Sequence, residues 1–253
     1  MIRSLTRRQA MLTGGAVLAA GAAGWPRFGN AYMEDAVKDG GRLKGVLRFT
    51  GTPPAEDEVS ISKDSHICGV GHVNPNPLTV SAAGALKDGV VALRKVAAGK
   101  PWNKAMTQPK VLQKACVFTP FVQVAPKGAA LTIVNEDPLL HNIHAYEQIG
   151  RARRTMFNIA QPAAGQTDVA PLRMRRGSVV EIDCDAHNWM SAWIYTADHP
   201  YLAVTGPDGV FDLTDVPPGS YELVMWHPVL GEKTHDVKLA AGETADLSID
   251  MKS

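Results

Sequence analysis

The chain has 253 residues, enough for one large or two small domains with a hydrophobic core. Hydrophobic residues make up 45% and charged residues 20%, a balance typical of a globular chain rather than a disordered one. A formal net charge of +1 excludes a strongly basic nucleic-acid-binding surface.

The N-terminal segment predicts export from the cytoplasm. Arg7 and Arg8 directly precede an apolar run, Met11–Gly24, of about 14 residues, which is shorter than the roughly 20 residues of a membrane span. Paired arginines before such a run indicate a signal peptide of the twin-arginine type. Small residues place the cleavage after Ala31, and an uncleaved membrane anchor is the alternative. With cleavage, we expect a periplasmic protein with no membrane span in the mature chain.

Many short strands are predicted after residue 40, and no convincing amphipathic helix. Residues 42–49 alternate between apolar and polar side chains and end at a Gly-Thr-Pro-Pro turn. Loops are expected over 64–77 and 99–109. Further strands are expected over 59–62, 78–80, 90–94, 116–125, 131–135, 142–146, 179–184, 192–195, 203–205, 210–213, 216–226, 233–239 and 244–251. Turn signals at roughly ten-residue spacing predict a β-sandwich.

Three cysteines, Cys68, Cys116 and Cys184, are present. In an oxidising compartment two of them are expected to pair, and the third then needs a separate role. Because Cys184 lies among potential metal ligands, we expect the disulfide to join Cys68 and Cys116. Three free, buried thiols are the alternative.

One loop carries the residues that indicate a metal site. Cys184 follows a predicted strand, and His187 and Met190 follow at three-residue intervals. A cysteine and two histidines in a trigonal plane, with a weak axial methionine, form the blue-copper arrangement. His141, which opens the strand after the turn at 135–140, supplies the second imidazole.

These two segments resemble the cupredoxins, which carry an Asn-x-Asp turn, then His-Asn, and much later a Cys-to-Met loop. The short loop most resembles that of amicyanin, a cupredoxin that takes electrons from methylamine dehydrogenase. The resemblance implies one mononuclear copper ion with the ligands His141, Cys184, His187 and Met190. It also implies that Asn142 forms a hydrogen bond near the thiolate and joins the two ligand loops.

The remaining histidines are less readily assigned. Strand alternation places His144 on the face opposite His141, so it is a possible extra ligand only if a bulge intervenes. His199 and His227 are expected to be structural, with a second metal site as the alternative.

Motifs along the whole mature chain are similar to those of an exported bacterial cupredoxin-like family often labelled methylamine-utilization proteins. The segment from Ala203 onward also resembles a carboxypeptidase regulatory-like domain, a transthyretin-like sandwich without catalytic activity. The motifs are Asp64-x3-Cys68-Gly69, Cys116-x-Phe-x-Pro120, Leu140-His-Asn-Ile-His144, Phe157-Asn-x-Ala-Gln-Pro162, Cys184-Asp-x-His-x-Trp-Met190, Asp198-His-Pro-Tyr-x-Ala-Val-Thr205, Val216-Pro-Pro-Gly219 and Trp226-His227.

The resemblances imply an all-β protein, a cupredoxin Greek-key β-sandwich with a small additional β-sandwich module. The expected divisions are a signal peptide over 1–31, an N-terminal β extension over 32–77, a copper domain over 78–198 and the small module over 199–253.

The implied function is that of a periplasmic type 1 copper protein that carries single electrons between redox proteins, a dehydrogenase or a c-type cytochrome. A copper protein for delivery or storage, without redox turnover, is the alternative, and a sandwich with a vestigial site is a third reading. The sequence has no phosphate-binding loop, nucleophile elbow or His-Glu-x2-His stretch. We therefore expect an electron carrier and not an enzyme, with no nucleic acid as a partner.

Overall fold

The computed structural model describes residues 32–253. The predicted twin-arginine signal peptide over 1–31 lies outside them. Within the described residues the only helix, α1 (Ser65–Cys68), has four residues, so no described helix could span a membrane.

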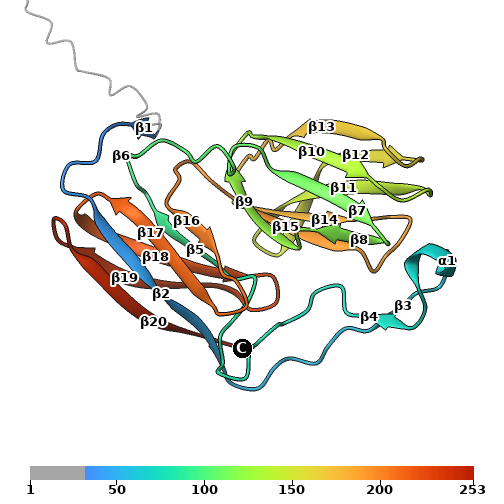
Figure 1. The fold of residues 1–253 in the computed structure, drawn as a ribbon, viewed down its shortest axis with the longest axis horizontal. Coiled ribbons are helices and arrows are strands. Elements are labelled where there is room, and N and C mark those ends of the chain that lie inside the picture. The colour runs from blue at the N-terminus through green and yellow to red at the C-terminus, as the bar shows by residue number, and fades with distance from the viewer. Residues whose placement is uncertain (1–31) are drawn as a thin grey trace, which may run out of the picture. The chain divides into compact units, whose positions relative to one another are not determined.

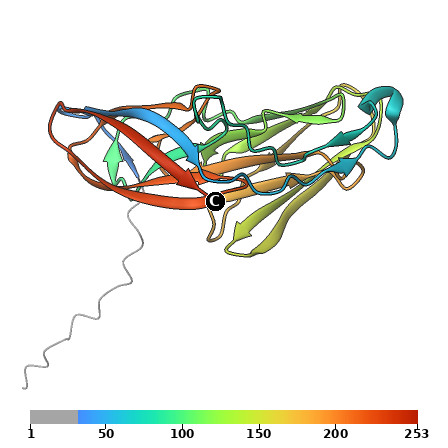
Figure 2. The ribbon, with the colours of Figure 1, turned by 90° about the horizontal axis from the view of Figure 1, so that it is seen from below.

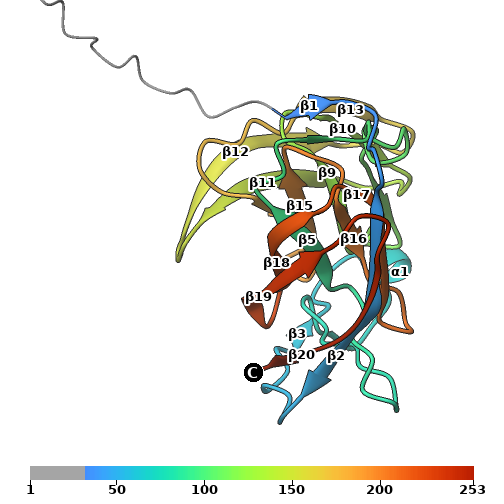
Figure 3. The same cartoon turned by 90° about the vertical axis from the view of Figure 1, so that its left-hand side faces the viewer.

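Two sheets that pack face to face form a first sandwich, which contains the predicted metal ligands (Figure 1). One sheet has the strand order β13-β10-β7-β8 and the other has the order β12-β11-β14-β15-β9. The strands of the first sandwich are β7 (Lys110–Lys114), β8 (Val117–Thr119), β9 (Val122–Pro126), β10 (Ala130–Asn135), β11 (His141–Ile149), β12 (Ala152–Gln161), β13 (Thr167–Pro171), β14 (Val179–Asp183) and β15 (Ser191–Ala197). Figures 2 and 3 show the β11–β12 hairpin extending beyond the rest of its sheet.

A second sandwich combines strands from both ends of the described chain. Its sheets have the orders β16-β5-β18-β19 and β17-β2-β20. The strands of the second sandwich are β2 (Gly41–Thr50), β5 (Val90–Arg94), β16 (Leu202–Val204), β17 (Val210–Val216), β18 (Gly219–His227), β19 (Gly231–Leu239) and β20 (Thr244–Lys252). β2 and β5 thus pair with strands of the segment 199–253, across the divisions expected from the sequence.

The segment 59–77, which we call the arm, leaves the second sandwich and runs beside the first (Figure 1). It contains β3 (Val59–Ser60), α1 and β4 (His72–Val73), and β3 pairs with β4. The remaining short pair is β1 (Met33–Glu34) with β6 (Ala98–Gly99).

Several strands contribute to two hydrophobic cores each, because side chains alternate between the two faces of a strand. In β15, Ala192 and Ile194 face the core of the first sandwich, whereas Trp193 and Tyr195 face a core shared by both sandwiches. β5 and β18 likewise divide their side chains between the second sandwich and this shared core. Such strands are buried on both faces, which explains the continuous apolar runs in their sequences.

The expected all-β sandwich architecture is confirmed, but several element boundaries differ. The predicted strand over 116–125 is two strands, β8 and β9, which lie in opposite sheets. Pro120 separates them, and proline has no backbone N–H for a ladder. The sequence analysis missed β7, β12 and β13, whose exposed polar and charged residues weaken the hydrophobic signal, and it placed α1 within a loop.

A buried carboxylate fixes the turn that precedes β14. The side chain of Glu147 on β11 is fully buried and accepts N–H groups of Arg175, Arg176 and Gly177 at 2.7–2.8 Å. It also accepts two hydrogen bonds from the Arg154 guanidinium. Burial by itself raises the pKa of Glu147, but these donors outweigh it and lower the pKa from 4.5 to about 2.

Glu147→Gln is expected to lower the free energy of unfolding near neutral pH by about 3 kcal/mol, since an amide replaces a charged acceptor. Because the pKa is lower in the folded chain, this stabilisation is present above about pH 4.5 and is lost as the pH falls toward 2. Urea unfolding should therefore show a difference in the free energy of unfolding between the wild type and the variant that is smaller near pH 3 than near pH 7. The control is Glu222→Gln. Glu222 forms an ion pair with Arg94 in which both side chains are more than a third exposed, so this substitution should lower the free energy of unfolding by at most about 1 kcal/mol.

Candidate metal centre

The fold brings the residues of two distant segments to one end of the first sandwich. His141 is the first residue of β11, and Cys184 directly follows β14, which is the antiparallel neighbour of β11. Two consecutive turns then follow, in which the N–H of His187 bonds to Cys184 O at 3.2 Å and the N–H of Met190 bonds to His187 O at 3.0 Å. All four side chains are at most 2% exposed.

Three potential ligand atoms form a triangle in this buried space. The Nδ1 atoms of His141 and His187 lie 3.0 Å apart. The Sγ atom of Cys184 lies 4.0 Å from the first nitrogen and 3.8 Å from the second. These three residues form one of the clusters of ligand atoms close enough to hold a metal ion within residues 32–253.

Two carboxylates determine which imidazole nitrogens face the triangle. The Nε2 atom of His141 lies 2.8 Å from Asp137 Oδ2, and that of His187 lies 3.0 Å from Asp64 Oδ2. A neutral imidazole carries one proton, and a carboxylate can only accept, so the proton is on Nε2 in both rings. When both rings are neutral, the two Nδ1 atoms present lone pairs to each other, a repulsion that a proton or a metal ion between them would remove. The same carboxylate–histidine pairing is typical of metal ligands.

The donor atoms of the triangle suit a metal ion. One cysteine sulfur and two imidazole nitrogens, all buried and within 4.0 Å of one another, would hold a copper-type ion, which accepts both thiolate and imidazole ligands.

Asp137 is itself held by the backbone. It accepts the N–H groups of Ala115 and Cys116 at 2.7 and 2.9 Å, and its own N–H donates to Asn135 Oδ1. Ala115 and Cys116 both have positive φ angles, which aim both N–H groups at the carboxylate. Burial raises the pKa of Asp137, but these donors and His141 outweigh it and keep the pKa below its usual value. Burial also lowers the pKa of His141, against the opposing effect of Asp137, so the ring is neutral at pH 7.

The thiol of Cys184 lies beside Asn142. The backbone N–H of Asn142 points at Sγ at 3.5 Å, and its side-chain Oδ1 lies 3.4 Å from Sγ. Burial raises the pKa of Cys184, although backbone N–H groups offset part of the effect. Without a metal the thiol is therefore protonated at neutral pH, and metal binding must release this proton. The Asn142 side chain also accepts the N–H of Ala186 and donates to Asp185, so it joins β11 to the ligand loop.

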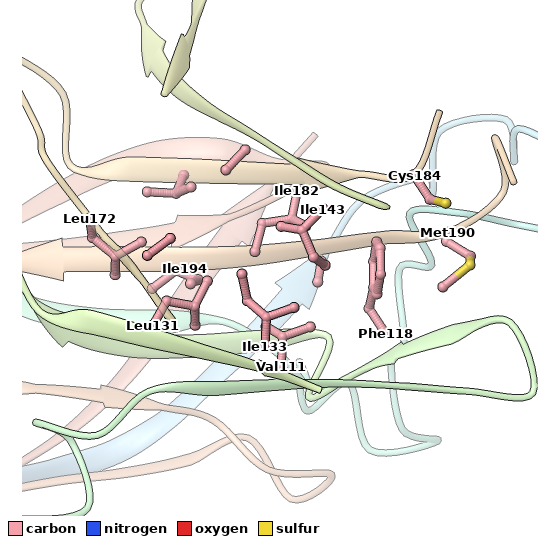
Figure 4. Close-up of a cluster of buried hydrophobic side chains, with 14 of the residues drawn as sticks. Val111, Phe118, Leu131, Ile133, Ile143, Leu172, Ile182, Cys184, Met190 and Ile194 are labelled. Carbon is pink, nitrogen blue, oxygen red and sulfur yellow. The ribbon is translucent and has the colours of Figure 1, made fainter. Parts of the chain in front are cut away.

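Met190 lies at the same end of the core of the first sandwich as Cys184, and Figure 4 shows both sulfur atoms there, beside Phe118. Its side chain also lines an apolar pocket of about 180 Å³, together with Trp189 and both residues of the disulfide. The Trp189 ring packs against His187 with the ring centres 5.1 Å apart. The loop therefore buries its ligand atoms under an aromatic side chain.

The other histidines lie apart from the triangle. Nδ1 of His144 is 3.0 Å from Asp185 Oδ1, and the ring stacks on Tyr146 at 4.1 Å, on the face of the sheet away from His141. His199 and His227 are buried, and the Nδ1 of each accepts a backbone N–H two residues later in the chain. None of the three belongs to a ligand cluster within residues 32–253.

The expected disulfide between Cys68 and Cys116 is confirmed, with a Cα–Cα distance of 5.0 Å, and Cys184 is free. The sulfur atoms of the Cys68–Cys116 disulfide lie within 4.8 Å of a ring nitrogen of His187. The bridge thus adjoins the triangle. From the sequence, Asp64 was named only in a motif and Asp137 was included only in the turn at 135–140, and their contacts with the histidines were not predicted. The spacing of Asp137 from His141 was a usable signal, whereas nothing local linked Asp64 to His187.

Comparisons with known proteins give structural neighbours only. No family model and no curated protein matches the chain. A copper-containing nitrite reductase from Thermus scotoductus SA-01 is 17% identical over 36% of this chain and 22% of its own, with a TM-score of 0.29. A purple cupredoxin from Nitrosopumilus maritimus is 17% identical over 36% of this chain and all of its own, with a TM-score of 0.30. A reduced Cu(I) form of an amicyanin variant is 12% identical over 42% of this chain and 98% of its own, with a TM-score of 0.29. At such low identities and TM-scores no function is inferred from these neighbours, and the proposals below rest on the residues of the site.

Proposed function

We propose that this protein is a type 1 copper protein that holds one copper ion between His141, Cys184 and His187, with Met190 as a weak fourth ligand, and that it carries single electrons. The observation that supports the proposal most directly is the buried triangle of two Nδ1 atoms and one Sγ atom, whose mutual distances of 3.0–4.0 Å suit a shared metal ion. Copper would supply a one-electron cycle between Cu(II) and Cu(I).

The surroundings of the triangle favour an electron carrier. Asp137 and Asp64 hold the two imidazole rings, and Asn142 holds the ligand loop against β11. Ligands fixed in this way keep one geometry in both oxidation states, so little reorganisation accompanies electron transfer. Delivery or storage of copper is less well supported, because exchange with another protein requires accessible ligands and these four side chains are at most 2% exposed.

The N-terminal segment and the second sandwich extend this proposal to the location and the partners of the protein. The arginine pair and apolar run before residue 32 support a periplasmic protein exported by the twin-arginine route. In that compartment the donor and the acceptor would be redox proteins, a dehydrogenase or a c-type cytochrome. We propose no catalytic activity, and we propose that the second sandwich, built from β2, β5 and β16–β20, serves in packing or docking.

The first test is copper binding by the purified protein. We expect one Cu(II) per chain, an intense visible absorption from thiolate-to-copper charge transfer, and reversible bleaching on reduction. Cys184→Ser should abolish the band, since the only free thiol of residues 32–253 is lost, while circular dichroism should show an unchanged fold. Tight but colourless Cu(I) binding would favour delivery or storage. Absence of uptake, or uptake unaffected by the substitution, would refute the proposed site.

Met190→Leu is expected to keep the copper and its charge-transfer band but to raise the reduction potential. A thioether stabilises Cu(II) weakly, and an aliphatic side chain of similar volume removes that donor without emptying the core. Voltammetry of the wild type and the variant measures the shift. Met174→Leu, which packs against the same core outside the ligand loop, is the control and should leave the potential unchanged.

Asp137→Asn is expected to weaken copper binding by about 10- to 100-fold, because the His141 ring loses the carboxylate that sets its tautomer. Competition with a chelator of known affinity measures the loss. Asp168→Asn, at a carboxylate that accepts hydrogen bonds from Gln161 and Gln166, is the matched control. Equal losses in both variants would mean that general destabilisation, and not ring orientation, is responsible.

A further inference from the structure

Asp64 and Asp137, which orient the imidazoles, are each held by hydrogen bonds close to a different cysteine of the disulfide. Asp64 directly precedes α1, and its backbone oxygen accepts the N–H groups of Ile67 and Cys68 at 2.9 Å. One turn therefore fixes Asp64 relative to Cys68. On the other side, the N–H of Cys116 donates directly to Asp137.

Near the site, few other contacts hold Asp64 in place. α1 contains no buried residue, and Asp64, which directly precedes it, has a left-handed backbone conformation with φ of 52°. The arm has a two-residue pair, β3–β4, and its remaining side-chain hydrogen bonds to the first sandwich lie at Pro75 and Asn76. At the Asp64 end, the attachments are the bridge, the bond to His187 and partial packing of residues such as Ile67.

We propose that the Cys68–Cys116 disulfide is a redox-sensitive latch on the metal centre, which holds Asp64 against His187 and the 115–116 turn against Asp137. The inference rests on the proposed copper function for its consequence, but the mechanical coupling belongs to the metal-free chain as well. With the bridge closed, both rings present Nδ1 to the triangle. With the bridge open, the arm is released at Asp64 and His187 loses the acceptor that fixes its tautomer.

The bridge is within reach of a small dithiol. Cys68 is half-buried and, with Cys116, lines the pocket of about 180 Å³ beside Trp189. A thiolate of the dithiol attacks the Cys68 sulfur, the S–S bond breaks, and Cys116 leaves as a thiolate. The second thiol of the reductant then displaces Cys68 from the mixed disulfide. In total the dithiol is oxidised to a disulfide, and two electrons and two protons reach Cys68 and Cys116.

The coupling is tested first without copper. Hydrogen exchange of the metal-free chain is measured before and after reduction by a dithiol, and in the variant Cys68→Ala/Cys116→Ala. We expect faster exchange over the arm residues 64–69 and at the N–H groups of 115 and 116, with unchanged protection of β14 and β15. Unchanged exchange of 64–69 would overturn the latch. Global loss of protection in both open forms would also overturn it, since the bridge would then support the whole fold.

Copper affinity is then compared by chelator competition between the oxidised wild type, the reduced wild type and the double variant. We expect the open forms to bind about 10- to 100-fold more weakly, as is typical when the partner of a ligating histidine is lost, and to show a shifted visible band. Asp64→Asn, with the bridge closed, should reproduce most of the loss. Asn76→Ala removes an arm contact with Trp193 far along the arm from Asp64, and this matched control should keep full affinity.

The outcomes separate the two proposals. If the oxidised wild type binds no copper, the proposed function fails, whereas the exchange measurement still decides whether the bridge holds the arm. If copper binds equally in the open and closed forms and with an unchanged spectrum, the latch is refuted and the copper function stands.

Discussion

The candidate metal centre depends on two hydrogen bonds, from the imidazole Nε2 atoms of His141 and His187 to Asp137 and Asp64. Each bond fixes a proton on the outer nitrogen and leaves a lone pair on the inner one. The two lone pairs and the Cys184 sulfur then face one small buried space. The polar groups around the triangle thus prepare three donor atoms that a cation could share.

Strand pairing delivers these groups from distant parts of the sequence. The β11–β14 ladder brings His141 beside Cys184, the β10–β11 turn places Asp137 beneath its histidine, and the arm supplies Asp64. All of these segments lie at the end of the first sandwich whose core includes Phe118 and Met190. A rigid core under the ligand loops suits electron transfer better than a mobile one, because the ligands need not rearrange.

The sequence predicted the sandwich, and it singled out His141, Cys184 and His187, which the structure brings together, because each has a local signal, either strand alternation or close spacing of soft ligands. It located strands that are apolar on one or both faces, such as β2 and β15, and missed β12, whose charged and exposed residues hide the period. The pairing of β2 with β20 and the contact of Asp64 with His187 join residues more than 120 positions apart. Contacts of this kind are set by tertiary packing, and no local pattern encodes them.

The parallel pairing of β2 with β20 also bears on how the chain reaches its native state. Arg42 aligns with Thr244, so the middle strand of this sheet lacks one neighbour until the residues after 243 have left the ribosome. The second sandwich must therefore fold after synthesis of these residues, and such non-local ladders close slowly. During that delay the edge of β2 that later pairs with β20 has unpaired backbone N–H and C=O groups, which other strands could pair with.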